Sequence, residues 1–214
     1  MRAILVCLLA VPVFAAPTEV KLDPEKPATL ELGRIRVTPG LSFRFSAPDK
    51  LTIGKDEWKL EGIKRDRWDK GYVGALADGV WTPEPGVSGR AASVIYQHPP
   101  AVREYPISAS CLGDDDVNVE FVDATGRFQA IQSVRRGDAA IVRVLCFSNA
   151  GKPLADKEVN LEPEARFKPA TSRSGSDGIA AFKADTAELP AGGYVARAFV
   201  NGKLKGKLVI SVGF

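Results

Sequence analysis

Apolar and polar residues alternate over short stretches throughout the second half of the chain. In residues 139–149, Val142, Val144 and Cys146 fall on one side of an extended chain, with Arg143 opposite. Four later stretches repeat this alternation, with the sets Val159 and Leu161; Ala180, Phe182 and Ala184; Tyr194, Ala196, Ala198 and Val200; and Leu204, Leu208, Ile210 and Val212. A period of two predicts β-strands that each bury one apolar face.

The last two of these strands are expected to form a hairpin. Asn201-Gly202 lies between them, and this dipeptide favours a tight two-residue turn because its glycine accepts positive φ. In the final strand Lys203, Lys205 and Lys207 alternate with the inward residues. We therefore expect these three lysines to point outward.

The first half of the chain contains further alternating stretches. Residues 30–48 predict two strands around a Pro-Gly turn, and residues 71–81, 92–97 and 117–123 predict more strands. The inward positions around that turn are Ile35, Val37, Leu41, Phe43 and Phe45. In residues 56–69 the apolar side chains form no continuous helical face, so we expect an extended segment or a short helical excursion.

Glycine and proline, with 20 and 15 residues, interrupt the chain every several positions, and long stripes of period 3.6 are missing. These features predict an all-β fold, in which strands with one apolar face each bury those faces between two packed sheets. We infer a β-rich N-terminal domain over residues 16–123 and a β-sandwich over residues 124–214. The boundary is placed near the turn residues 123–126.

A set of turn and inward positions runs from about Phe128 to the last strand: Gly151, Pro153, Leu154, Asp177, Gly178, Ala180, Gly193, Tyr194 and Ala198. This pattern resembles the group 1 bacterial immunoglobulin-like domain, the type repeated in invasin and intimin. The family's D-x-x-G turn is shortened here to Ser176-Asp177-Gly178. The resemblance implies an immunoglobulin-like sandwich for the C-terminal half, and related sandwich modules such as carboxypeptidase-regulatory-like and macroglobulin-type domains share most of these cues. Residues 16–122 match no family that we can name.

The N-terminus is typical of a secretory signal. Met1-Arg2 is followed by an apolar run from Ile4 to Phe14, and cleavage after Ala15 fits best. The run is shorter than the roughly 20 residues that span a bilayer, and no later segment could be a membrane anchor. We expect a secreted or periplasmic protein, with a buried N-terminal strand as the alternative.

Export leaves two cysteines, Cys111 and Cys146. An even number of cysteines in an exported chain usually oxidises, so we expect one disulfide between them, which could tie the two domains together. The alternative is two separate buried thiols. With one histidine in the chain, a metal site from this pair is not expected.

The formal net charge of +3 comes from dispersed basic residues interleaved with acids, which does not favour nucleic acid as a partner. His98 lies between extended residues and two prolines, where a turn histidine is far commoner than a catalytic base. Asp114, Asp115 and Asp116 follow a glycine, so calcium binding stays open beside a solvated turn. We predict no catalytic residue, no cofactor and no metal.

Three tryptophans, Trp58, Trp68 and Trp81, lie close together in the N-terminal half. They could fill a core or form a stacking platform for sugars. The leading hypothesis is an exported, non-enzymatic envelope protein with a binding or structural role, whose partner is an envelope protein or a glycan. The alternative is a carbohydrate-binding or accessory module that uses these aromatic residues.

Overall fold

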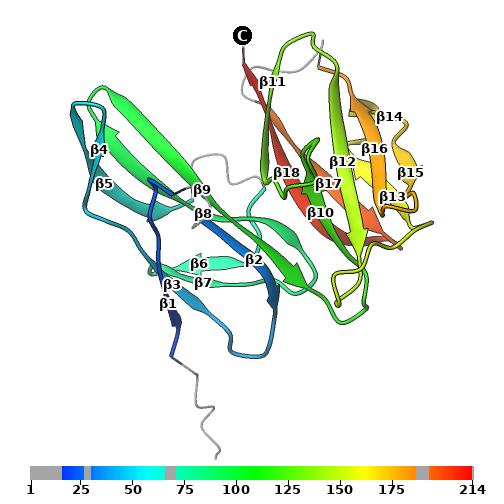
Figure 1. Ribbon diagram of the computed structural model, residues 1–214, viewed down its shortest axis with the longest axis horizontal. Coiled ribbons are helices and arrows are strands. Elements are labelled where there is room, and N and C mark those ends of the chain that lie inside the picture. Colours follow the sequence, from blue (N-terminus) through cyan, green and yellow to red (C-terminus); the bar gives the residue numbers. More distant parts are fainter. Residues whose placement is uncertain (1–15, 27–29, 66–70, 187–192, 214) are drawn as a thin grey trace, which may run out of the picture.

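The computed structural model describes residues 16–26, 30–65, 71–186 and 193–213, and these form β-strands in three sheets (Figure 1). The signal sequence expected over residues 1–15 and Trp68 lie outside these ranges. The strands are β1 (Thr18–Lys21), β2 (Glu31–Arg36), β3 (Phe43–Ser46), β4 (Lys50–Ile53), β5 (Asp56–Lys64), β6 (Ala75–Ala77), β7 (Val80–Thr82), β8 (Ser88–His98), β9 (Ala101–Leu112), β10 (Asn118–Val122), β11 (Ile131–Arg135), β12 (Ala140–Phe147), β13 (Glu158–Glu162), β14 (Phe167–Lys168), β15 (Thr171–Arg173), β16 (Ile179–Ala184), β17 (Tyr194–Val200) and β18 (Lys203–Gly213). Within these ranges the chain has no helix of the length and apolarity that crossing a bilayer requires.

The N-terminal module packs a four-stranded sheet, in the order β1-β3-β7-β6, against strands β2, β9, β8, β5 and β4. Apolar side chains from both layers fill the space between them, among them Phe45, Trp81 and Tyr96. Trp81 is fully buried, and its Nε1 donates to the Val73 carbonyl over 2.8 Å. Burying large aromatic side chains of this kind is a principal stabilising term for a module of this size.

The C-terminal module is an immunoglobulin-like sandwich. One sheet has the order β10-β12-β16-β14, and the other contains β15, β13, β17, β18 and β11. Consecutive strands β10 and β11 lie in opposite sheets, because β10 pairs antiparallel with β12 whereas β11 pairs parallel with β18. The inward sets predicted for β12, β13, β16 and β17 are confirmed, and their members fill the core between the sheets.

The predicted turns of this module are confirmed as well. The Asp177 carboxylate accepts the Ile179 N–H over 3.0 Å, and Gly178 adopts a φ of 78°. Asn201 and Gly202 both have positive φ, 52° and 72°, as a type I′ hairpin turn between β17 and β18 requires. These turns set the register of the strands that line the core.

One expectation for the first half needs correction, and two others are confirmed with more detail. Residues 117–123 do not belong to the N-terminal module, because β10 pairs with β12 and Phe121 lies in the C-terminal core. We therefore place the division between the modules in residues 113–117 instead of near residue 123. The two strands of residues 30–48 form, but β2 pairs with β9 and β3 with β1 and β7, so they lie in different sheets. Residues 56–64 form strand β5, which confirms the extended alternative for this segment.

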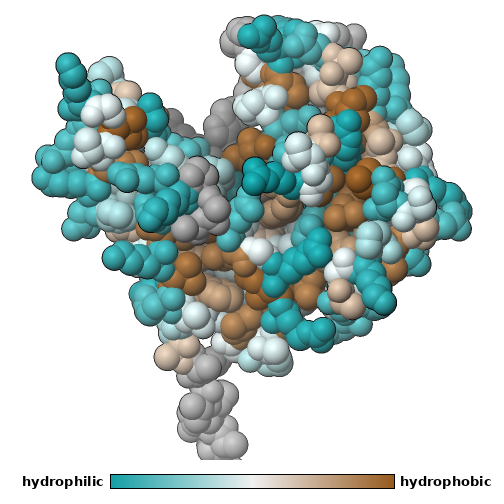
Figure 2. Space-filling view, in the orientation of Figure 1, coloured by the Kyte–Doolittle hydropathy of each residue, from teal (hydrophilic) through white to brown (hydrophobic). Residues whose placement is uncertain are grey.

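Strand β18 joins the two modules. Gly206 in β18 pairs with Ser88 in β8 through a parallel bridge, so one sheet continues from the C-terminal into the N-terminal module. Figure 1 shows the modules meeting near this point, while the hairpin β8–β9 extends away from the C-terminal module. In Figure 2 hydrophobic side chains gather on this face where the modules meet, and hydrophilic side chains cover most of the remainder.

Candidate functional site

Two recesses lie side by side along one rim of the C-terminal sandwich, and we call them together the rim groove. Their volumes are about 490 and 210 Å³. They share Asp138 and Ala139 in the turn between β11 and β12, so the rim groove is continuous. Its longer part follows β11 and the start of β12, and its shorter part lies beside the end of β16.

Strand β11 brings unpaired backbone groups to the rim groove. The Val209 N–H donates to the Ala130 carbonyl, and the Arg136 N–H donates to the Gly213 carbonyl. In a parallel ladder every second residue faces the neighbouring strand, so the backbone groups of Ile131, Ser133 and Arg135 face away from β18. Of these groups, the Arg135 carbonyl accepts the Asp138 N–H over 3.2 Å within the following turn. Among the strands that the structure describes, none pairs with this second edge of β11.

The start of β12 is open on the same side. Strand β10 ends with Val122 opposite Arg143, so residues 140–142 have no strand beside them on that edge within the described chain. The Gln132 side chain reaches across instead, and its Nε2 donates to the Ile141 carbonyl over 3.2 Å. Two strand edges, one from each sheet, therefore line the groove.

The charged side chains of the rim groove differ in how they are paired. The Asp123 carboxylate accepts the N–H groups of Thr125 and Arg127 at 2.7 and 3.0 Å, and the Thr125 hydroxyl also donates to it. These hydrogen bonds lower the pKa of Asp123, with the Thr125 side chain as the largest cause. By contrast, no described acidic side chain forms an ion pair with Arg135 or Arg143. Among the described side chains that line the groove, Arg135, Arg143 and Lys183 are cations without an ion pair, and the Asp138 carboxylate is an anion without one. The groove thus presents more positive than negative charge to a ligand.

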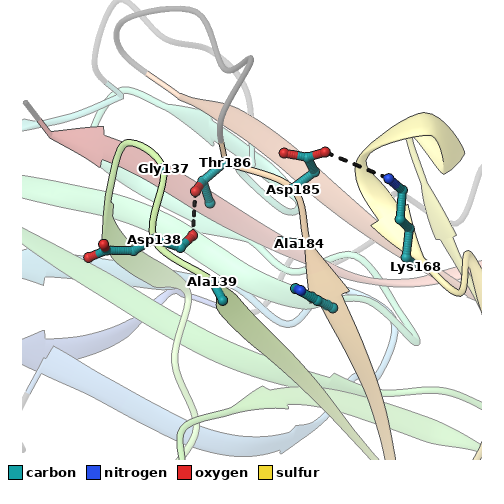
Figure 3. A pocket seen from close by; sticks show the side chains of 8 residues that line it. Gly137, Asp138, Ala139, Lys168, Ala184, Asp185 and Thr186 are labelled. Atoms are coloured by element: carbon teal, nitrogen blue, oxygen red, sulfur yellow. Dashed lines mark hydrogen bonds and ion pairs between the residues drawn. The ribbon is translucent and has the colours of Figure 1, made fainter.

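The shorter part of the rim groove is built from short side chains and one exposed ion pair (Figure 3). Lys168 and Asp185 point toward each other across its mouth, with 3.8 Å between Nζ and Oδ2. The Thr186 hydroxyl donates to the Asp138 carbonyl and closes the inner end. This arrangement holds the β11–β12 turn against the end of β16.

The two tryptophans within the described ranges, Trp58 and Trp81, do not form an exposed platform. Trp81 is fully buried and Trp58 is 6% exposed, both in the N-terminal core. The His98 ring lies against Trp58 with 5.5 Å between centroids, and His98 Nδ1 is 3.1 Å from the Glu57 carbonyl oxygen. Of the described residues, Trp58 and Trp81 therefore have core roles, and His98 covers one of them.

The expected disulfide is absent. Cys111 and Cys146 are free, buried thiols, one in the core of each module. Each side chain points into its own core, so the two sulfurs do not meet. Burial raises the pKa of Cys111 to about 12 and that of Cys146 to about 11, which suppresses the reactive thiolate at neutral pH.

Asp115 and Asp116 form hydrogen bonds that hold the segment between the modules. Asp115 accepts from Lys205 at 2.5 Å and from Lys203 at 3.5 Å, and Asp116 accepts the Asn149 N–H at 2.6 Å. In the described part of the chain, no cluster of three or more acidic, histidine or cysteine side chains could hold a metal ion. The negative charge of the Asp115 carboxylate is already balanced by the ammonium groups of Lys205 and Lys203.

Sequence reasoning missed the residues that lie between the modules. Lys205, expected to point outward, is 4% exposed, and Arg34 pairs with Glu120 across the junction. The predicted alternation fails at this point, because the pairing of β17 with β18 shifts register between Ala198 and Phe199. Leu204, expected to point inward, packs against the N-terminal core, and Lys205 lies against Gly86 of that module. The only sequence signal was the glycine at position 206 beside the lysines, which interrupts an otherwise regular strand.

The comparisons with known proteins found little. No protein-family model and no curated protein sequence matches the chain. Three chains of solved structures match. One is the D0-D1 domain of intimin, 13% identical over 61% of this chain and 63% of that chain, with a TM-score of 0.38. Another is FdeC, described as an Escherichia coli adhesin, 14% identical over 73% of this chain and 49% of that chain, with a TM-score of 0.31. The chain spans less than two thirds of either, and at these scores the fold rests on the strand pairing described above.

Proposed function

We propose that the chain is an exported, non-enzymatic protein of the cell envelope that binds an extended segment of a partner protein along β11. The observation that carries the proposal is the free edge of this strand, which presents the backbone groups of Ile131 and Ser133 and the N–H of Arg135. An exposed strand edge accepts a further strand through main-chain hydrogen bonds. Export rests on the signal-like residues 1–15.

The charges beside β11 favour an acidic partner segment. Arg135 and Arg143 line the rim groove and have no ion pair with a described carboxylate, while the carboxylate of Asp123 is held by its own turn. Side chains of an added strand alternate between two faces, so carboxylates at every second position would meet these arginines.

A non-enzymatic role is supported by the two cysteines, the histidine and Asp115, because each of these side chains is used in the fold. Both thiols are buried with raised pKa values, and His98 packs on Trp58. Asp115 is paired with lysine. A carbohydrate-binding role would need a surface other than Trp58 and Trp81, which lie in the core.

The proposal is tested by placing a photo-reactive amino acid at position 133 in the cell that exports the protein. We expect an envelope protein to be cross-linked from position 133, and the cross-link to weaken strongly when Arg135 is replaced by Glu. Thr171 in β15, on another exposed strand of the same sheet, is the matched control position. Equal cross-linking from both positions, or none, would contradict binding along β11.

Two further assays separate the alternatives. Binding to a glycan array by the purified chain, unchanged by Ser133→Pro, would favour a carbohydrate-binding module. Turnover of a panel of esters and glycosides would contradict a non-enzymatic protein. We expect neither.

A further inference from the structure

We propose that the junction between the modules is a lock, which fixes the angle between them and makes them unfold as one unit. Domains joined by an exposed linker with few contacts move relative to each other by default. In this chain the linker, the strand beside it and the facing surfaces are all held by specific contacts, and none of these contacts belongs to the rim groove.

The linker itself is pinned at both ends. The Gly113 N–H donates to the Asn118 side chain over 2.8 Å, and the Asn149 side chain donates to the Gly113 carbonyl over 3.1 Å. The Asn149 N–H donates to Asp116 over 2.6 Å. One asparagine of the C-terminal module therefore holds two points of a five-residue linker, which leaves it little freedom to bend.

A buried lysine fastens the linker to the last strand. Lys205 is 4% exposed, and its Nζ lies 2.5 Å from Oδ1 of Asp115 in the linker. The next lysine, Lys207, donates to the Tyr72 carbonyl of the N-terminal module over 2.8 Å. On its other side Lys205 lies against the N-terminal module, since a Cβ on Gly86 would lie 3.5 Å from Nζ. A change of angle would remove this cover from a buried charge.

A second ion pair crosses the junction on β2 and β10. Arg34 of the N-terminal module donates through Nε and Nη2 to both carboxylate oxygens of Glu120, each over 2.9 Å. The Arg34 guanidinium also lies 3.8 Å from the centre of the Phe147 ring. This pair resists rotation of one module against the other, because both hydrogen bonds require the guanidinium and the carboxylate to stay in one plane. The contact with the Phe147 ring also holds the guanidinium in place.

Glycines let the backbones of the two modules touch. A Cβ on Gly113 would lie 3.0 Å from the Cα of Gly86, and a Cβ on Gly89 in β8 would lie 3.2 Å from the Lys207 carbonyl oxygen in β18. Contacts this close leave no layer of side chains or water that could allow sliding. Together with the bridge from Gly206 to Ser88, they make the junction part of the folded sheet.

The tryptophans provide a direct test, because all three lie before the linker. In urea denaturation of the whole chain, tryptophan fluorescence follows the N-terminal module, whereas far-ultraviolet circular dichroism follows both modules. We expect the two curves of the natural protein to coincide. Two curves with clearly different midpoints would overturn the proposal, whatever the variants do.

The double variant Arg34→Ala/Asp115→Ala removes both ion pairs without touching either core. We expect its two denaturation curves to separate and its small-angle X-ray scattering to show a larger maximum dimension than the natural protein. Arg173→Ala is the matched control, since Arg173 pairs with Asp156 and Glu158 within one module. Coincident curves and unchanged scattering in the double variant would overturn the lock.

Discussion

Cys111 and Cys146 sit in separate cores, and burial raises both pKa values far above neutral. We therefore expect Ellman's reagent to find no reactive thiol in the folded protein at pH 8. After unfolding in guanidinium both thiols should react. Mapping of unreduced peptides provides the control. A peptide that links Cys111 to Cys146 would contradict the structure and restore the disulfide predicted from the cysteine count.

Asp115 should make stability depend on pH in the acid range. Burial alone would raise its pKa, but hydrogen bonds and charge from Lys205 and Lys203 outweigh burial and lower the pKa below its ordinary value. Its contribution to the free energy of unfolding is therefore present above pH of about 4 and lost as the pH falls through the lower folded pKa.

The comparison of natural protein with Asp115→Asn measures this contribution. We expect the variant to be less stable by about 1–2 kcal/mol at pH 7, because Lys205 loses its charged partner in a site that is partly exposed. The difference in urea unfolding should shrink below pH of about 4. Asp114→Asn, one position earlier in the same exposed turn, serves as the control. A difference that stays constant down to pH 2 would contradict this role.

At the scale of elements, the turn before β16 should tolerate no side chain at Gly178. Its φ is 78°, and a Cβ there would lie 2.6 Å from the Cys146 carbonyl oxygen. We expect Gly178→Ala to lower the free energy of unfolding by about 2–4 kcal/mol, from strain and from the clash.

Gly126→Ala is the matched control for this turn. Gly126 also has positive φ, 83°, but nothing lies within 4 Å of a Cβ built on it. Only the backbone strain remains, so we expect a loss of about 1 kcal/mol. Equal losses in the two variants, measured by urea unfolding, would show that the contact with the Cys146 carbonyl is unimportant.

Alternation predicted the strands of the C-terminal module well, because each has one face on a core and one on solvent. Val142, Val144 and Cys146 illustrate this, as all three are buried on one side of β12. Partner strands could not be predicted in the same way. Strand β10 alternates like its neighbours, and the sequence does not indicate that it pairs forward with β12 instead of backward within the first module.

The candidate site was less predictable than the fold. Nothing in the residues 131–135 distinguishes an edge strand from a central one, since an unpaired edge is a property of the assembled sheet. Lys205 shows the same limit, because the surface that buries it includes Gly86, Gly113 and Asp115, which are far from it in the sequence. For the tryptophans the sequence left two roles open, a core or a stacking platform. Tertiary packing puts Trp58 and Trp81 in the core.

At the scale of the whole molecule, the two modules have different tasks in this account. The junction holds them at one angle through Arg34, Lys205 and the glycine contacts. The rim groove lies on the C-terminal module away from these residues and keeps its strand edge free among the described strands. A partner strand on β11 would extend a sheet that already runs through both modules.

The most direct test of binding along β11 is amide hydrogen exchange at residues 131–136, measured by NMR. The natural chain is measured alone and in complex with the partner protein that cross-linking from position 133 identifies. In the free chain the amides of Gln132, Val134 and Arg136 should exchange slowly, and those of Ser133 and Arg135 rapidly. In the complex we predict that Ser133 and Arg135 become protected. Amides of Ser133 and Arg135 that are already protected in the free chain, or that exchange as fast in the complex, would contradict the account.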